Sequence, residues 1–398
     1  MKLSPFLSVL ALSQLLAPDL MSPLYAQHQI LAQPERVLAD GMTWIGSIRP
    51  LSDGRVLILD MAERRVMLVD AAFRQATPVG RIGGGPGEYT RPINLIPFSG
   101  DTTFINDPGN NRLLLIDESG RTRETIELPG GGLPCTQLAV EWRRQPPLLA
   151  DQRGRFYAKA NNVKLDSRGA LAATDSSAIE RWNYRRCSRD TVAMLPVPGG
   201  ANEQVVGPGI VIRPFDTNRN PFPATTQWAV ADDGTVAIVY PDPYHVEYIA
   251  SSGTRVRGRN LSIDPVRVSE SHKQRWRDEQ EKTLSGATMV RRGGTTVTPA
   301  PRGIVKIPEP SEWPRFLPPF LEKAVYFDNQ GDLWIQRTVP GGDPPSVDVL
   351  DRTGKLKAQV RLPHSTRIAG FALGKVYLIR TDADGLETLE QYRWPPAR

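Results

Sequence analysis

Cysteine and histidine are scarce in this sequence, and their scarcity limits the metal sites that it can form. Its 398 residues include two cysteines and four histidines, so a multi-histidine metal centre or a zinc ribbon would be difficult to build. The absence of a Gly-x-Ser-x-Gly motif excludes a prolyl-oligopeptidase-like hydrolase domain. The sequence also lacks the His-Glu-x-x-His, Cys-x-x-Cys and P-loop motifs. It therefore says more about architecture than about chemistry.

Long apolar runs are absent except near the N-terminus. The stretch Phe6–Ala17 is apolar over the length of a signal peptide, which is shorter than the roughly 20 residues of a membrane span. We expect residues 1–26 to be a signal peptide cleaved after Ala26, with a disordered or core-docked N-terminus as the alternative. The mature chain, residues 27–398, is then predicted to be periplasmic or secreted and to contain no membrane span.

The two cysteines gain a possible role from this predicted location. Outside the cytoplasm, Cys135 and Cys187 become a candidate disulfide. The bond would close a loop of about 53 residues, which stabilises a fold by limiting the unfolded chain. Two buried free thiols are the alternative that the sequence leaves open.

Glycine and proline are abundant, and an internal repeat runs between them. The 34 glycines and 36 prolines indicate many turns. Asp60 and Arg65 recur 47 residues later as Asp107 and Arg112. Each unit has two short apolar runs around a polar turn, a pattern that predicts two strands. Weaker copies begin near residues 151, 233, 329 and 374. A period of about 45 residues in an all-β chain predicts a six-bladed β-propeller with four-stranded blades.

The last blade of such a propeller must be closed, because a terminal blade otherwise exposes an unpaired edge. We expect a strand around Arg36–Leu38 to complete the sixth blade beside a strand near Leu389–Trp394. The chain would then join its two ends in one sheet.

Two segments carry a family resemblance. Ile105–Leu113 resembles the core of an NHL-type repeat, in which an acidic residue and Gly-Asn-Asn-Arg precede a strand. Gly80–Pro92 is similar to the glycine-rich connection between blades of these repeats. The chain thus resembles secreted bacterial six-bladed propellers of the NHL-repeat-like type. The resemblance implies the fold and leaves the function open, because such propellers include protein binders, RNA binders and enzymes.

The repeated polar residues have a structural interpretation. Asn110 can take the left-handed conformation of a tight turn at low cost. Arg65 and Arg112 occupy one position in successive blades, where a fork of donors can tie carbonyls or carboxylates together. With Asp60 and Asp107, we interpret these side chains as structural blade residues and not as ligand contacts.

One segment interrupts the repeat between the predicted fourth and fifth blades. Asp264-Pro265 and Gly286 predict a helix over 265–285, within an insertion of about residues 263–319. Residues 253–306 contain twelve bases and five acids, a net charge of +7. The segment is either a solvated insertion or a docking surface for an acidic protein or an anionic envelope polymer.

The loops that enter the inner strands contain the predicted ligand contacts. Glu88, Tyr89 and Arg91 offer an acceptor, a stacking face and a cation within four residues. His245 replaces the repeated arginine in the fourth unit and is a candidate titrating contact at the rim. A satisfied surface histidine is the alternative.

These features favour an extracytoplasmic, non-catalytic binding module, expected to be monomeric, without catalytic residues, metal or cofactor. Its partner would be a protein or an anionic envelope polymer, and the signal peptide argues against nucleic acid. The alternative is a calcium-dependent lactonase-like hydrolase with a metal in the axial channel. Glu88 and Asn94 could contribute to such a site, but the other blades offer no matching set.

Overall fold

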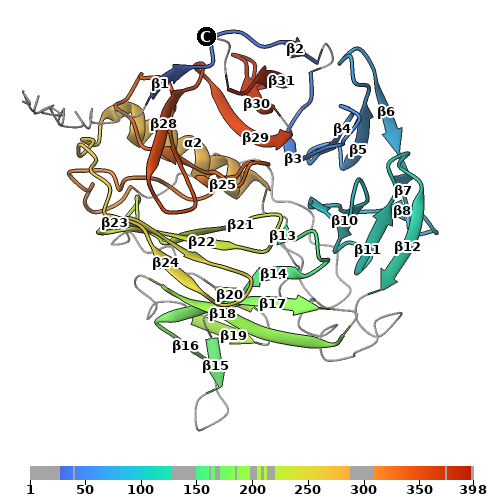
Figure 1. The fold of residues 1–398 in the computed structure, drawn as a ribbon, viewed down its shortest axis with the longest axis horizontal. Coiled ribbons are helices and arrows are strands. Elements are labelled where there is room, and N and C mark those ends of the chain that lie inside the picture. Colours follow the sequence, from blue (N-terminus) through green and yellow to red (C-terminus); the bar gives the residue numbers. More distant parts are fainter. Residues whose placement is uncertain are drawn as a thin grey trace, which may run out of the picture.

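Six antiparallel sheets surround one axis in the computed structural model, which confirms the predicted all-β, six-bladed propeller (Figure 1). The structure describes residues 27–38, 41–127, 149–160, 163–165, 171–183, 186–197, 204–207, 210–212, 220–286, 309–372 and 374–395. Among these residues, no helix is long and apolar enough to cross a membrane.

The first three blades follow the repeat along the chain. Blade 1 consists of β3 (Ile45–Pro50), β4 (Val56–Asp60), β5 (Arg65–Val69) and β6 (Ala76–Val79). Blade 2 consists of β9 (Asn94–Pro97), β10 (Thr103–Asp107), β11 (Arg112–Ile116) and β12 (Thr122–Glu127). Blade 3 consists of β13 (Leu149–Ala150), β14 (Phe156–Lys159), β17 (Ser176–Asn183) and β18 (Ser188–Pro196).

The other three blades complete the ring. Blade 4 consists of β21 (Gln227–Val230), β22 (Val236–Pro241), β23 (Tyr244–Ile249) and β24 (Arg255–Arg257). Blade 5 consists of β25 (Val325–Phe327), β26 (Leu333–Arg337), β27 (Ser346–Leu350) and β28 (Leu356–Arg361). Blade 6 contains β29 (Thr366–Ala372), β30 (Lys375–Thr381) and β31 (Glu387–Arg393).

The N-terminal part of the described chain closes the ring. β2 (Arg36–Val37) pairs antiparallel with β31, with Arg36 opposite Gln391, and the N–H of Leu38 donates to the carbonyl of Leu389 at 2.9 Å. The predicted closure is confirmed. β1 (Gln27–Ile30) adds a parallel strand to the outer edge of blade 5 beside β28. The same segment therefore covers two neighbouring blade edges, a protection that the sequence did not suggest.

Among the described residues, three two-stranded sheets are separate from the sheets of the six blades. β7 (Arg81–Ile82) and β8 (Glu88–Tyr89) form a parallel pair between blades 1 and 2. The hairpins β15 (Val163–Leu165) with β16 (Leu171–Ala173) and β19 (Gln204–Gly207) with β20 (Ile210–Ile212) lie within blade 3 and after it. The core consists of apolar side chains packed between neighbouring blades, such as Ile96, Phe104 and Trp182 between blades 2 and 3.

The helix between blades 4 and 5 forms, but it begins later than predicted. α2 spans Glu270–Gly286, and Ser269 caps it: the Ser269 N–H donates to the imidazole Nδ1 of His272 at 3.1 Å, and the His272 N–H donates to the Ser269 carbonyl at 3.0 Å. This exchange resembles a capping box. Pro265 does not start the helix because the chain after it is extended, with the Val266 carbonyl accepting the N–H of Leu317.

Candidate functional site

The glycine-rich connection between blades 1 and 2 uses its own polar side chains to hold itself together. Tyr89 is 1% exposed; its hydroxyl donates to the Val79 carbonyl at 2.8 Å and accepts the Val66 N–H at 2.9 Å. Burial raises the pKa of Tyr89. The expectation that Tyr89 offers a stacking face is therefore corrected, because its ring fills the space between the blades.

Glu88 is also engaged within the connection. Its carboxylate accepts the Gly85 N–H at 2.6 Å and a bond from the Arg81 guanidinium. The Gly85 N–H and the Arg81 side chain hold the pKa of Glu88 below its usual value. Arg91 is exposed, and its backbone N–H donates to Asp107 at 2.8 Å. Of Glu88, Tyr89 and Arg91, which were predicted to contact a ligand, only Arg91 has an exposed side chain.

The repeated residues of blade 2 tie this connection to the sheet. Asp107 accepts the N–H groups of Thr90 and Arg91. Arg112 donates to the carbonyls of Gly85 and Glu88 at 2.9 and 2.6 Å. Asn110, in the turn between β10 and β11, donates from its Nδ2 to the Gly83 carbonyl of the connection at 2.9 Å. The arrangement accounts for the spacing of the motif, because each polar group reaches a backbone group of the adjoining loop.

Blade 1 repeats only part of this arrangement. Asp60 accepts the N–H of Thr43 at 3.1 Å, as Asp107 does for its own loop. Arg65 is half exposed and pairs with Glu63 of its own turn at 3.5 Å, so it acts within its own blade, whereas Arg112 reaches the adjoining connection.

The residue in the left-handed conformation also differs from expectation. It is Asn111, with a φ of 52°, whereas Asn110 was expected to occupy that position. In blade 1 the corresponding residue is Arg64, with a φ of 53°. The turn therefore places its positive φ immediately before the repeated arginine in both blades.

His245 is buried and not at the rim. It is 6% exposed, its ring stacks on Tyr240 at 4.7 Å between centroids, and its Nδ1 lies 2.6 Å from the Pro243 carbonyl. Nε2 lies 3.9 Å from Glu247. These contacts correct the expectation of a titrating ligand contact, because the ring is enclosed by its own blade.

The predicted disulfide remains a prediction. Cys187 is exposed, but Cys135 lies outside the described residues, as does the predicted signal peptide of residues 1–26.

The two ends of the insertion pair with each other near the points where the chain leaves and re-enters the ring of blades. Arg267 and Phe316 form an antiparallel bridge, and the N–H of Val268 donates to the Arg315 carbonyl at 3.2 Å. Phe316 is 36% exposed. The guanidinium carbons of Arg267 and Arg315 lie 5.4 and 5.2 Å from its ring centroid. We call these three residues the Arg–Phe–Arg surface.

Several side chains of α2 pack on this part of the molecule. His272 is buried, and its Nε2 lies 3.0 Å from the Val339 carbonyl in the loop after β26. Trp276 makes an edge-to-face contact with Trp313 at 5.4 Å, and Trp313 contacts Phe222 at 5.9 Å. The helix is thus anchored to the propeller more firmly than a purely solvated excursion would be.

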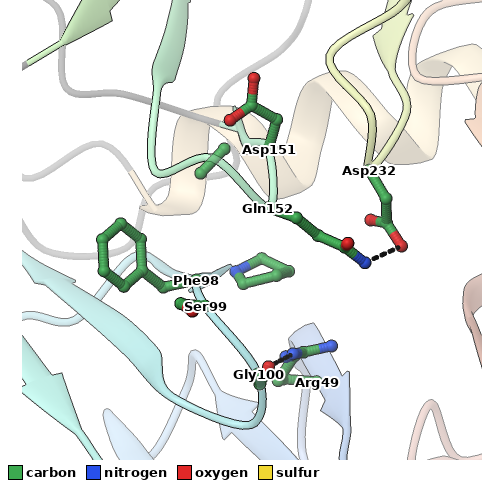
Figure 2. A pocket seen from close by; sticks show the side chains of 9 residues that line it. Arg49, Phe98, Ser99, Gly100, Asp151, Gln152 and Asp232 are labelled. Carbon is green, nitrogen blue, oxygen red and sulfur yellow. Dashed lines mark hydrogen bonds between the residues drawn. The ribbon is translucent and has the colours of Figure 1, made fainter.

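A cavity lies at the end of the propeller opposite to the insertion, and Figure 2 shows it from close by. Its volume is about 210 Å³, and four blades form its lining: Arg49, Pro97, Phe98, Ser99, Gly100, Ala150, Asp151, Gln152 and Asp232. Most of these residues belong to turns between the first and second strands of their blades, whereas α2 belongs to a connection between blades. Because antiparallel strands alternate in direction, the two kinds of connection lie at opposite ends. We call them the turn end and the insertion end, and the cavity the axial pocket.

Sequence reasoning missed the axial pocket. Arg49, Gln152 and Asp232 belong to three different blades and share no motif. The one local signal is Arg49 itself, a charged residue in the otherwise apolar and small inner strand β3. Its position predicts a polar contact near the axis but not its partners.

The two residues considered for a calcium site belong to different strands. Asn94 begins the inner strand β9, whereas Glu88 lies in β8 and is bound within the connection. In the part of the chain that the structure describes, no three His, Cys, Asp or Glu side chains are grouped closely enough to hold a metal ion.

Comparisons with known proteins add little to this geometry. No protein-family model matches the sequence, and no curated protein matches it either. Similar solved structures include regucalcin, a calcium-binding protein from Agrobacterium tumefaciens (12% identity, 93% of this chain and 97% of that one, TM-score 0.42). Another is a gluconolactonase from Xanthomonas campestris (11% identity, 93% of this chain and 99% of that one, TM-score 0.43). A third is virginiamycin B lyase from Staphylococcus aureus (10% identity, 91% of this chain and 88% of that one, TM-score 0.37). Likenesses this distant carry no argument about activity.

Proposed function

We propose that this protein is an extracytoplasmic, non-catalytic binding module that docks an anionic envelope polymer on its insertion end. The Arg–Phe–Arg surface carries the proposal: two exposed arginines flank an exposed aromatic ring on a segment held in place by backbone hydrogen bonds. A predicted signal peptide supports a location in the envelope.

The chemistry of this surface suits a polymer of acidic sugars. A flat aromatic ring can pack against the apolar face of a sugar, and guanidinium groups pair with carboxylates or phosphates in a bidentate manner. The arginines already lie against Phe316, so less side-chain freedom is lost when they bind.

The charge of the surrounding sequence agrees with this partner. Residues 253–306 have a net charge of +7, while Arg267, Arg275 and Arg315 are exposed around the bridge and the helix. An excess of positive charge on one end would attract a polyanion over a longer range than the direct contacts.

The test is a titration with polygalacturonate, an acidic polysaccharide, and with neutral dextran as the reference ligand. The double variant R267A/R315A should bind polygalacturonate about tenfold more weakly than wild type, since two charged contacts are lost. F316A should weaken binding by a smaller factor because it removes the ring but keeps both cations.

The control is R74A/R121A, which removes the same charge from exposed positions on blades 1 and 2. This variant should stay within about twofold of wild type, since long-range attraction alone is weak in salt. Equal losses in the two double variants would show that net charge, and not the Arg–Phe–Arg surface, determines binding. Equal affinity of the wild type for dextran would also contradict the proposal.

A further inference from the structure

The axial pocket contains an arginine that the fold leaves largely unused. One guanidinium nitrogen of Arg49, Nη2, donates to the Gly100 carbonyl at 2.6 Å, and Nε is buried without a hydrogen-bond partner among the described residues. In Figure 2 the second terminal nitrogen points away from the bond to Gly100. A guanidinium has five N–H donors. Because Nη2 is bonded to Gly100 and Nε is buried, the second terminal nitrogen is the one left for a molecule in the pocket.

Burial affects Arg49 more than its acidic neighbours do. Burial lowers the pKa of the guanidinium, and the carboxylates of Asp101 and Asp232 raise it by less. Asp101 is itself engaged, because it accepts hydrogen bonds from the N–H and the hydroxyl of Ser52. The positive charge of Arg49 is therefore incompletely compensated by the protein.

A carboxylate stands across the pocket from this arginine. One oxygen of Asp232 accepts a hydrogen bond from the Gln152 Nε2 at 3.1 Å, and the backbone N–H of Gln152 donates to the Asp232 carbonyl at 2.9 Å. These two bonds fix the turns of blades 3 and 4 to each other. No other hydrogen bond to the Asp232 carboxylate is made within the described ranges, so its second oxygen can accept a donor from a ligand.

The remaining lining limits the size and polarity of what fits. Pro97, Phe98 and Ala150 supply an apolar wall beside the charged pair. A volume of about 210 Å³ corresponds to roughly seven non-hydrogen atoms, if each takes the volume of one water in the liquid. A short zwitterion matches both this volume and the two opposite charges.

We infer that the axial pocket binds a free α-amino acid with a short side chain, its carboxylate on Arg49 and its ammonium group on Asp232. The Gln152 side chain would hold the Asp232 carboxylate in position, and the apolar wall would receive the side chain of the amino acid. This site lies at the turn end, so its failure would leave the proposed polymer binding at the insertion end untouched.

Isothermal titration calorimetry of the full mature chain with L-alanine tests the inference. Wild type should show saturable binding with a dissociation constant below about 1 mM, which is within reach of a well-matched ligand of six atoms. N-acetylalanine, which lacks the ammonium group, and alanine amide, which lacks the carboxylate, should each bind at least tenfold more weakly. Glucose, a neutral polyol, should not compete.

Substitutions separate the two charged contacts. D232N keeps an acceptor for Gln152 but removes the charge, and we expect at least a tenfold loss of alanine affinity. D233N is the matched control, because Asp233 lies in the same turn and pairs with Arg352 outside the pocket. It should stay within twofold of wild type.

R49Q should also reduce alanine affinity at least tenfold, and its melting temperature is measured in parallel because Arg49 is partly buried. If R49Q does not fold, D232N still tests the inference, because Asp232 is exposed and its substitution should not prevent folding. The inference is overturned if wild type shows no saturable binding of alanine, if the two blocked analogues bind as well as alanine, if glucose competes, or if D232N and D233N behave alike.

Discussion

The two ends of the propeller present charge in opposite ways. At the insertion end, Arg267 and Arg315 lie exposed against an exposed ring, all contributed by one insertion. At the turn end, Arg49 and Asp232 face one cavity, and different blades contribute them, Arg49 from the inner strand β3 and Asp232 from the turn between β21 and β22. An insertion can add a broad surface for a large partner, whereas converging turns can form a small enclosed site. The comparison suggests that one scaffold separates polymer binding from small-molecule binding.

The largest expected effect concerns the connection between blades 1 and 2, which lies at the insertion end. Arg112→Ala removes a donor to the partly buried carbonyls of Gly85 and Glu88. We expect a loss of about 2–4 kcal/mol in the free energy of unfolding, measured by urea denaturation. Arg65→Ala, at the same position of the repeat but half exposed, should cost less than about 0.5 kcal/mol. Equal losses would mean that Arg112 does not tie the connection between blades 1 and 2 to the sheet.

The next largest expected effect is a difference between the two ends in how strongly ligand affinity depends on salt. Raising the salt concentration from about 50 to about 300 mM shortens the range of electrostatic attraction. We expect polygalacturonate affinity to fall more than tenfold and alanine affinity to change less than threefold, since the axial pocket is partly enclosed. Titrations of one protein batch at both concentrations measure this. A similar salt dependence for the two ligands would remove the distinction between the ends.

A pH effect is expected from the turn end. Burial raises the pKa of Asp117, but hydrogen bonds from Ser119 and Arg121 outweigh it and hold the pKa at about 2. A carboxylate whose pKa is lowered by folding stabilises the folded state when the pH is above the pKa that it has in the unfolded chain, near 3.9. This contribution is lost as the pH falls from about 4 towards 2.

Asp117→Asn should therefore destabilise the protein by about 1–2 kcal/mol at pH 6 and by less at pH 2.5, because most of the lost contribution has already disappeared as the pH approaches the folded pKa of about 2. Urea unfolding at both pH values measures the difference. A destabilisation that is the same at the two pH values would show that Asp117 acts through its shape and not through its charge.

The smallest effect is expected from chelation. Adding EDTA should leave the melting temperature and polygalacturonate affinity unchanged, because the proposed contacts at the two ends use arginines and a carboxylate and no metal. A drop of several degrees, restored by calcium, would favour the calcium-dependent hydrolase that the sequence left as an alternative.

The scaffold could be predicted from the sequence because its signals are local. Asp107 and Arg112 repeat the spacing of Asp60 and Arg65, and each acts on a loop that adjoins its own strand. The closing strand at Arg36 followed from the need to cover an edge. The start of α2 was misplaced because Asp264 and Ser269 both resemble a cap, and the bridge to Phe316 decides between them.

The sites could not be predicted in the same way. Glu88 and Tyr89 looked like ligand contacts because a sequence does not show that their polar groups are satisfied by Arg81, Gly85 and the backbone of blade 1. Arg49 and Asp232 are 183 positions apart, and only the closed ring brings them to one cavity.

The most direct test of the account is the polygalacturonate dissociation constant of R267A/R315A at low salt, measured beside its alanine dissociation constant. The account predicts that polymer affinity falls about tenfold from wild type while alanine affinity is unchanged, since the Arg–Phe–Arg surface and the axial pocket lie at opposite ends. Unchanged polymer affinity in this variant would contradict the account.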